Sequence, residues 1–308
     1  MSSRAKFSVN PFPWFADGPD SWTLTAQTVT EAIGGVADAG FASIAADLPA
    51  NMTPTAYAEL LDARGLRPSP CYWGIFFDCG EGALPAIREE AKKRAAAQTA
   101  LGVDGIIIAD ELYPARRARP GTGKDFDQDR LDRLIENVAD IASVLTAEGL
   151  TPYFHPHVAS WIETDAEVRA LLDAVDPKTL AFGPDVAHLA WAGADPVKLI
   201  GDYTDRVGLI HLKDAHLAAV ERVREQGLSY DAAVYENHVF TEPGRGDIDL
   251  AAVVAAVPND YEGWWVTEVD VPDLPSKEES TLASARWMLE HIPGAESAQP
   301  GLTLRARL

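Results

Sequence analysis

Four side chains that can bind a metal ion or move a proton stand in the second half of the sequence, each at the end of a short apolar run. They are His155, Asp185, His211 and Glu268. Short apolar runs of this kind predict buried strands. An ionisable group at the end of such a strand is costly to bury without a partner. We therefore interpret Asp185, His211 and Glu268 as metal ligands, with Glu268 also a catalytic candidate.

For three of these side chains, a second polar residue stands two positions later in the sequence. The pairs are His155 with His157, His211 with Lys213, and Glu268 with Asp270. Residues two apart in an extended strand share a face, so the members of each pair belong to the same side of the sheet. We interpret His155 as a fourth ligand or a catalytic acid or base. We expect His157 and Lys213 to hydrogen-bond substrate oxygens or a developing enolate charge.

The candidate ligands are carboxylates and imidazoles, with no thiolate among them. Such a set suits Mn²⁺, Co²⁺, Mg²⁺ or Fe²⁺, whereas ligand type alone does not favour Zn²⁺. We expect Mn²⁺ or Co²⁺ as the cofactor, and the residue types leave the choice among these ions open.

Further candidates come from other strand ends and from loops. Glu111 ends the fourth predicted strand and is a weaker candidate for the base that removes a proton. His188 either supports the site, as a substrate-binding residue or as a partner of a metal ligand, or packs as a structural histidine. Arg245 could reach over the site from a long loop. Trp14 and Trp73 could supply apolar walls against a sugar ring, although core packing explains a single tryptophan equally well.

Short β-rich runs alternate along the chain with longer stretches whose apolar residues recur at helical spacing. The predicted strands are Lys6–Val9, Phe41–Ala46, Pro70–Trp73, Gly105–Ala109, Thr151–His157, Leu180–Asp185, Val207–Lys213 and Trp264–Asp270. Predicted helices between them include Leu84–Leu101, Phe126–Leu145 and Asp165–Val175. This alternation implies parallel strands and right-handed crossovers, which close into an α/β fold of the (β/α)₈ TIM-barrel type. A doubly wound sheet is the runner-up, and no G-x-G-x-x-G turn follows the first strand to support it.

The same pattern predicts one barrel domain over residues 1–308, without a linker that divides it. A loop insertion around residues 215–246 follows the seventh strand, and so leaves from the face where barrel enzymes place loops over the substrate. Residues 293–308 show no periodicity and are interpreted as a peripheral extension or a subunit contact. The chain could therefore form a homo-oligomer.

Charge and composition exclude several classes of partner. The formal net charge is −21 with 26 Lys and Arg, and no basic tract offsets it, which disfavours nucleic acid. No apolar run approaches the roughly 18 residues of a membrane helix. The only cysteines, Cys71 and Cys79, are too few for a disulfide scaffold, which favours the reducing cytoplasm. The expected partner is a small polyol or sugar.

Several stretches along nearly the whole chain carry a family resemblance. The most specific are residues 239–249, VFTEPGRGDID, and residues 261–264, YEGW. Supporting stretches are 153–157 (YFHPH), 185–193 (DVAHLAWAG), 211–214 (HLKD) and 9–11 (VNP). Together they resemble the xylose isomerase-like superfamily of sugar phosphate isomerases and epimerases, and within it the inosose dehydratases of inositol catabolism.

The resemblance implies a metal bound by Glu, Asp, His and Glu from the last four strands. These positions correspond to His155, Asp185, His211 and Glu268, so the first glutamate is replaced by histidine. Epimerases of this superfamily exchange protons between two glutamates, and the replacement removes one of them. Elimination needs a polarised ketone, a base for the adjacent proton and help for the leaving β-hydroxyl. A metal-dependent lyase that dehydrates an inosose-type cyclic keto-polyol is therefore the leading hypothesis.

Other functions remain as alternatives. One is a sugar isomerase or epimerase. Another is the large subunit of a C-glycoside deglycosidase, which acts on 3-keto-glycosides and requires a small partner subunit. Endonuclease IV shares the barrel, but its trinuclear zinc cluster and DNA surface disagree with the ligands and the charge found here. A non-catalytic sugar-binding barrel is the alternative of another class, since a fold alone does not fix activity.

Overall fold

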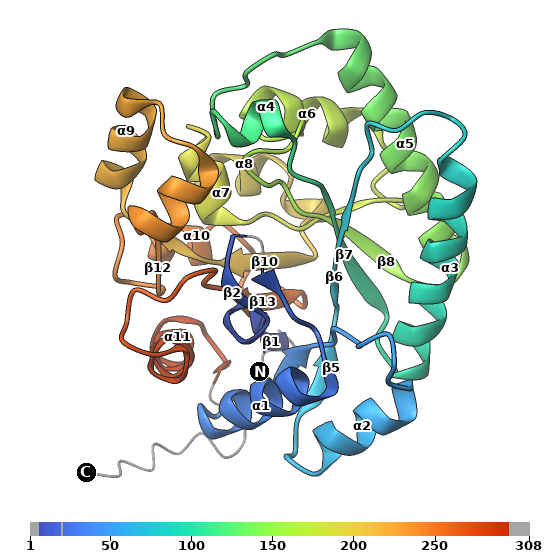
Figure 1. The fold of residues 1–308 in the computed structure, drawn as a ribbon, viewed down its shortest axis with the longest axis vertical. Coiled ribbons are helices and arrows are strands. Elements are labelled where there is room, and N and C mark those ends of the chain that lie inside the picture. Colours follow the sequence, from blue (N-terminus) through green and yellow to red (C-terminus); the bar gives the residue numbers. More distant parts are fainter. Residues whose placement is uncertain (1–5, 20, 296–308) are drawn as a thin grey trace.

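Eight parallel strand positions form a barrel in the computed structural model, which describes residues 6–19 and 21–295 (Figure 1). The third position is occupied by two short strands in succession. The strands are β1 (Lys6–Val9), β4 (Ser43–Ala45), β5 (Arg67–Ser69) with β6 (Tyr72–Ile75), β7 (Gly105–Asp110), β8 (Thr151–Phe154), β9 (Ala181–Phe182), β10 (Leu209–Leu212) and β13 (Trp264–Thr267).

Parallel pairing runs around most of the circle in two segments. One has the order β10-β13-β1-β4-β5 and the other β6-β7-β8-β9. Isolated parallel bridges, Phe182 with Val207 and Asp185 with His211, join β9 to β10. The (β/α)₈ barrel predicted from the alternation is therefore confirmed.

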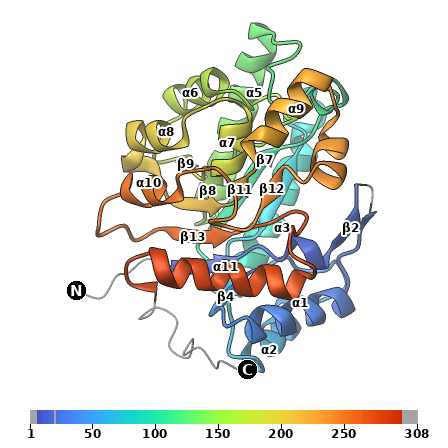
Figure 2. The same cartoon turned by 90° about the vertical axis from the view of Figure 1, so that its left-hand side faces the viewer.

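A helix follows each strand position and covers the outside of the barrel (Figure 2). These helices are α1 (Ala26–Asp38), α2 (Pro54–Asp62), α3 (Leu84–Ala100), α5 (Gln128–Ala147), α6 (Asp165–Ala174), α8 (Pro196–Asp202), α10 (Leu250–Ala255) and α11 (Lys277–His291). The three helices predicted from the sequence, α3, α5 and α6, each start and end within two residues of their predicted bounds. Side-chain caps fix several starts, as where the Thr164 hydroxyl accepts a bond from the Glu167 amide.

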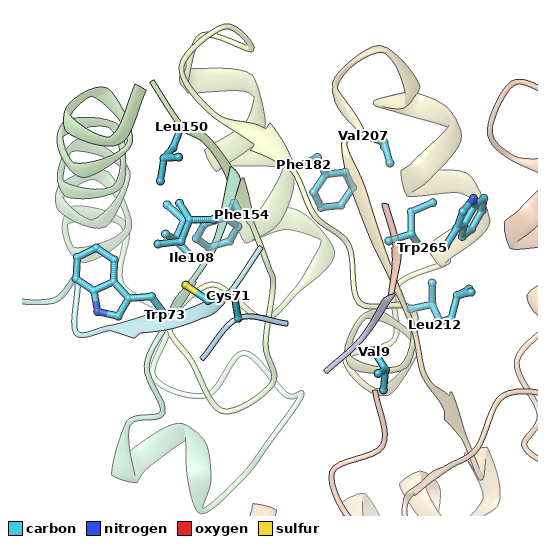
Figure 3. Close-up of a cluster of buried hydrophobic side chains, with 14 of the residues drawn as sticks. Val9, Cys71, Trp73, Ile108, Leu150, Phe154, Phe182, Val207, Leu212 and Trp265 are labelled. Atoms are coloured by element: carbon cyan, nitrogen blue, oxygen red, sulfur yellow. The ribbon is translucent and has the colours of Figure 1, made fainter. Parts of the chain in front are cut away.

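The outward faces of the strands pack against this helical layer. Ile108, Phe154 and Phe182 are fully buried there, and Leu212 and Trp265 continue the same layer around the barrel (Figure 3). Strand residues of alternate parity face inward instead, so the two faces of each strand have different partners. The site residues must therefore come from the inward set.

The inside of the barrel is filled near its N-terminal end by a separate apolar cluster. Tyr153 packs there with Ile107, Leu209, Trp264 and Val266. Glycines on neighbouring strands make room for the tyrosine ring: a β-carbon at position 208 would lie 2.4 Å from Tyr153 Cε1, and one at position 105 would lie 2.5 Å from Cε2. The ring therefore closes the bottom of the barrel beneath the polar mouth.

The prediction of an uninterrupted strand over Pro70–Trp73 is wrong, because the sheet is broken at this point. Pro70 has no amide hydrogen to donate to a ladder. The Cys71 amide instead donates to the side chain of Gln98 (3.4 Å), while the Ala46 amide bonds back to Ser69 (3.1 Å). Strand β5 consequently pairs only with β4, and β6 only with β7.

Shorter elements cover the mouth of the barrel. They are α4 (Pro114–Arg117), α7 (Val186–Trp191), α9 (Leu217–Gln226), a π-helical turn at Ala232–Glu236, and the two-stranded pairs β2 (Ala16–Gly18) with β3 (Ser21–Trp22) and β11 (Asp214–Ala215) with β12 (Phe240–Thr241). The predicted insertion at 215–246 is thus built of α9, the π-helical turn and β12. Most of the predicted extension, residues 296–308, lies outside the described residues. Among the helices that are described, none is long and apolar enough to cross a bilayer.

The tight fit around Tyr153 gives a stability prediction. Replacing Gly208 with Ala should lower the free energy of unfolding by about 1–3 kcal/mol, because the new methyl group overpacks the barrel interior. Gly201→Ala is the matched control: it lies in α8 with nothing within 4 Å of the added carbon, and should be neutral or stabilising. Urea denaturation measures both, and equal stability of the two variants would contradict the predicted role of the tyrosine ring.

Candidate metal centre

Three of the predicted ligands meet at the C-terminal mouth of the barrel. One ligand atom from each of His155, Asp185 and His211 lies within 4.8 Å of the others, and all three side chains are fully buried. His155 follows the end of β8 and His211 lies in β10, so both occupy inward positions directly above the apolar interior. The period of two in the strands therefore brings them together.

Asp185 is held in place by the helix that it starts. Its Oδ1 atom caps α7 by accepting bonds from the amides of Ala187 (2.9 Å) and His188 (3.0 Å). The other oxygen, Oδ2, lies 3.8 Å from Nδ1 of His211 and makes no hydrogen bond of good geometry. One oxygen thus fixes the side chain while the second faces the centre.

The two imidazoles have nitrogen atoms with no hydrogen-bond partner among the described residues. Neither Nδ1 nor Nε2 of His155 or of His211 is hydrogen-bonded, although both rings are fully buried. Buried polar atoms are nearly always satisfied, so four such nitrogens in one place need an explanation. Imidazole nitrogens and a free carboxylate oxygen are suitable ligands for a divalent transition metal.

A lysine ammonium lies beside these ligands, among three carboxylates. Lys213 Nζ is 3.2 Å from Asp185 Oδ2, 2.5 Å from Glu268 Oε1 and 2.8 Å from Asp270 Oδ2. The other oxygen of Glu268 lies 3.6 Å from His211 Nδ1 and accepts a bond from the side-chain nitrogen, Nδ2, of Asn10. Glu268, the fourth predicted ligand, therefore lies next to the three-residue group.

Burial keeps the imidazoles neutral. It lowers the pKa of His155 and His188 well below the ordinary value, and that of His157 to about 4. Burial also lowers the pKa of His211, with Glu268 acting in the opposite direction. A neutral imidazole is the form that binds a metal. Contacts of His211 with the carboxylates are therefore not ion pairs.

Charge in this cluster is unbalanced. Although burial alone would lower it, the pKa of Lys213 is raised well above its ordinary value by Asp185, Asp270 and Glu268. The ammonium in turn holds the pKa of Glu268 below its usual range against the effect of burial. One positive charge then faces three carboxyl groups, of which burial raises the pKa of Asp270, and buried charge without a partner is costly. A divalent cation would balance the negative charge that remains, so the residues fit the metal that the resemblance implies.

An open cavity of about 950 Å³ reaches Glu268, which lies beside the centre, whereas His155, Asp185, His211 and Lys213 are fully buried and do not line it. Glu268, Asp270 and His157 line its inner end, and Glu111 and Trp73 line its wall. Of the predicted substrate-contacting residues, His157 and Trp73 are therefore at the cavity. The volume lies in the upper part of the range for small-molecule sites, about 300–1,000 Å³.

Two of the cavity side chains are oriented by their neighbours. A β-carbon at Gly74 would lie 2.3 Å from Oε1 of Glu111, so only glycine leaves room for this carboxylate over β6. The Nδ1 atom of His157 lies 2.6 Å from the carbonyl oxygen of Val158. Since a carbonyl only accepts, Nδ1 carries the proton and Nε2 keeps a lone pair.

Other predicted residues have different surroundings. His188 is buried behind the centre, with its ring 3.7 Å from that of His157 and Nε2 3.3 Å from Lys213 Nζ. Trp14 is buried against α1, where a β-carbon at Gly35 would lie 2.5 Å from its ring, and it does not line the cavity.

Arg245 is half exposed and lies 3.4 Å from Glu242, away from the cavity. The loop around it is anchored by Asp214, whose carboxylate accepts bonds from the amides of Gly244, Gly246 and Ile248 at 3.0–3.1 Å. This stretch therefore shapes the cover of the barrel, and its arginine points outward.

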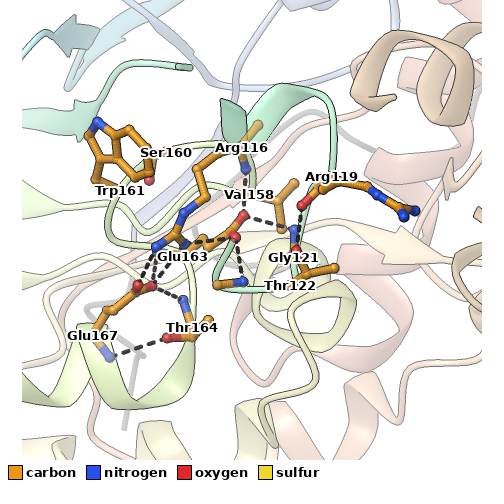
Figure 4. Close-up of polar contacts among 12 residues, drawn as sticks. Arg116, Arg119, Gly121, Thr122, Val158, Ser160, Trp161, Glu163, Thr164 and Glu167 are labelled. Carbon is orange, nitrogen blue, oxygen red and sulfur yellow. Dashed lines mark hydrogen bonds and ion pairs between the residues drawn. The ribbon is translucent and has the colours of Figure 1, made fainter. Parts of the chain in front are cut away.

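A buried ion-pair network frames the loops beside His157 (Figure 4). Arg116 bonds Glu163 (2.8 Å) and Glu167 (2.6 Å), and all three side chains are almost fully buried. Glu163 also accepts bonds from the amides of Gly121 and Ala159, both at 2.8 Å. The network ties the loop after β7 to the loop after β8.

Sequence reasoning missed several polar groups at the site. Asn10 is at an inward position just after β1 and binds Glu268, so strand parity could have found it. Tyr72, in β6, lies with its ring edge-on to His155, at 5.5 Å between centroids, and lines the cavity. Tyr230 also lines it but comes from the insertion, where no periodic signal exists.

Comparison with known proteins agrees with this architecture. The family described as xylose isomerase-like TIM barrel matches residues 34–291, a span that includes all four candidate ligands. The chain belongs to the xylose isomerase-like TIM-barrel family. The matched residues include every barrel strand after β1.

Relatives of this chain include inosose dehydratases. The enzyme of Geobacillus thermodenitrificans (strain NG80-2) is 26% identical over 297 residues, covering 94% of this chain and 97% of that enzyme. The enzyme of Bacillus cereus (strain AH820) is 31% identical over 167 residues, covering 54% of this chain and 56% of the relative's length. The protein is an enzyme, as these relatives are.

A solved structure shares the fold. The crystal structure of the IolI protein with a bound zinc atom aligns with a TM-score of 0.68, covering 93% of this chain and 98% of that one, at 12% sequence identity. At this identity the likeness supports the xylose isomerase-like barrel architecture, which the strand pairing shows independently.

The unsatisfied nitrogens lead to a metal-binding prediction. His211→Ala should weaken Mn²⁺ binding by about 100-fold or more, because it removes a ligand rather than a neighbour of one. His216→Ala is the control, since that ring is partly exposed and contacts Asp273 instead. Competition against a chelating indicator gives the affinities, and circular dichroism checks the fold. Unchanged Mn²⁺ affinity in His211→Ala would exclude this centre.

The ion-pair frame gives a second prediction. Arg116→Leu leaves two buried carboxylates without their partner and should lower the free energy of unfolding by about 3–5 kcal/mol. Arg117→Leu, which removes a partly exposed pair with Asp231 (2.6 Å), should cost about 1 kcal/mol or less. Guanidinium denaturation measures the free energy of unfolding of both variants. A similar loss in both would show that the buried network stabilises the fold no more than an exposed ion pair does.

Proposed function

We propose that the chain is a metal-dependent lyase that dehydrates a cyclic keto-polyol of the inosose type. The observation that carries the proposal is the meeting of His155, Asp185 and His211, with Glu268 and the ammonium of Lys213 beside them at the end of an open cavity. The inosose dehydratase relatives support the same reaction class. A zinc atom is bound in the IolI protein, and for this chain Mn²⁺ or Co²⁺ remains our expectation from ligand type.

His155, Asp185, His211 and Glu268 would hold the metal. A divalent cation at this position supplies Lewis-acid polarisation of the substrate ketone, which makes the adjacent C–H bond more acidic. His155 serves as a ligand in this proposal because both of its ring nitrogens lack a hydrogen-bond partner and face the other ligands. Histidine at this position leaves one carboxylate fewer for proton exchange, which favours elimination over epimerisation.

Lys213 has a separate task. Its ammonium is fixed by Glu268 and Asp270, so it is oriented before the substrate arrives. A preorganised cation of this kind stabilises negative charge that develops on a substrate oxygen, and costs no reorganisation during the reaction. We assign Lys213 to hydrogen-bonding the oxygen that gains charge when the proton leaves.

Glu111 is the proposed base. Its carboxylate lies in the cavity wall over Gly74. It removes the proton next to the ketone, and the same carboxyl group then returns that proton to the departing β-hydroxyl. One water molecule is released, and no net proton is consumed. His157 can accept a bond from a substrate hydroxyl through Nε2.

Turnover of scyllo-inosose by the purified chain tests the proposal. With Mn²⁺ the product should be lighter than the substrate by one water molecule, and removal of metal with EDTA should stop its formation. Mass spectrometry measures both. The chain is assayed alone, because a requirement for a small partner subunit would identify a deglycosidase subunit instead. Exchange of the adjacent proton with solvent without loss of water would identify an isomerase or epimerase.

A variant pair separates the base from the metal ligands. Glu111→Gln should lower kcat about 100-fold or more while the protein keeps its metal, since general-base catalysis contributes about that much. Glu89→Gln, on the exposed side of α3, is the control. Wild-type kcat in Glu111→Gln would refute the assignment of the base.

A further inference from the structure

The break between β5 and β6 opens the barrel wall. On one side of the break the chain leaves β4 through residues 46–52, and on the other side β6 pairs only with β7. The cavity that starts at Glu268 continues past Tyr72 through this break and reaches the surface of α3. We call the part outside the barrel wall the side limb, lined by Asp47, Leu48, Met52, Trp73, Lys93 and Arg94.

The walls of the side limb combine an apolar surface with polar groups. Trp73 has the outward parity of β6 and therefore packs against α3. The guanidinium of Arg94 lies 5.0 Å from the centre of its ring. Leu48 and Met52 add further apolar surface to the same cavity. A mixed surface of this kind suits a ring with apolar faces and a polar edge.

The polar groups of the side limb are balanced in charge. Arg94 bonds Glu90 at 3.0 Å, and Lys93 lies 4.0 Å from the same residue. Asp47 accepts a bond from the amide of Tyr72 at the break. Two cations and two carboxylates thus share the limb, leaving no excess positive charge to hold a phosphate or carboxylate. The groups that remain suit hydroxyls, which both donate and accept hydrogen bonds.

We propose that the side limb binds a second, neutral, hydroxylated ring, so that the substrate is a glycoside of a cyclic keto-polyol. This inference rests on the proposed function, because it takes the ring at the metal centre to be the one that reacts. The volume is compatible with it: the whole cavity, including the part lined by Phe12, Trp22 and Tyr235, measures about 950 Å³, which is more than a monocyclic polyol fills. The second ring lies beyond the barrel wall, while the reacting ring lies beside Glu268 and Asp270.

Binding of two unreactive probes tests the side limb apart from the reaction. myo-Inositol and galactosyl-myo-inositol both lack the ketone, so neither can be dehydrated by this route. Calorimetry with the Mn²⁺-loaded protein should show the galactosyl compound binding at least about tenfold more tightly, through contacts of its second ring. Similar dissociation constants for the two probes in the wild-type protein would overturn the proposal.

A matched pair of variants on α3 locates the binding. Ala97 lines the cavity, whereas its neighbour Ala96 is exposed and does not. In Ala97→Phe the added ring fills the limb, and the ratio of the two dissociation constants should fall below about threefold, whereas Ala96→Phe should keep the wild-type ratio. Lys93→Ala, at a largely exposed position that folding tolerates, should lower the ratio by about threefold. An unchanged ratio in both Ala97→Phe and Lys93→Ala would refute the limb.

Failure of the two proposals can be told apart. Normal dehydration of scyllo-inosose together with equal binding of the probes rejects the side limb alone. Tight binding of the galactosyl compound, lost in Ala97→Phe, together with no dehydration of scyllo-inosose rejects the proposed reaction but keeps the limb.

Discussion

A buried lysine ammonium among three carboxylates is the interaction on which the mouth of this barrel depends. Lys213 holds Asp185, Glu268 and Asp270 within 3.2 Å of one atom, with Lys213 and Asp185 fully buried and the other two at the end of the cavity. Burying so many charges is costly unless they are balanced and hydrogen-bonded. The neutral imidazoles cannot supply the missing positive charge. The need for a divalent cation therefore follows from the electrostatics of the cluster as much as from the ligand types.

Most of the barrel and the centre could be predicted because both depend on one short-range rule. Inward and outward residues alternate along a strand, so an apolar run that ends in His-x-His or His-x-Lys must place those groups at the mouth. His155, Asp185 and His211 meet as this rule implies. Asn10 obeys the same rule, although a lone amide after β1 gives no chemical signal until its partner Glu268 is known.

Residues whose positions depend on contacts far apart in the sequence could not be predicted in the same way. The residue type of Trp14 suits a sugar-binding wall and the core equally well, and only the fold shows that α1 gives it a place in the core beside Gly35. Arg245 points outward because Asp214, thirty residues earlier, binds the loop amides around it. Neither the packing partner nor the anchor can be read from local patterns, since each is chosen by the closed fold.

The broken strand shows how a defect in the sheet and the shape of the cavity are linked. Pro70 interrupts the ladder, and buried backbone groups left there would be costly. Side chains satisfy them: Gln98 binds the Cys71 amide and the Ala46 carbonyl, and Asp47 binds the Tyr72 amide. The Gln98 side chain lies between the backbone groups of Cys71 and Ala46, so these two backbone segments are farther apart than directly paired strands would be. The groups that repair the sheet therefore also hold open the passage through the wall and line it with polar atoms.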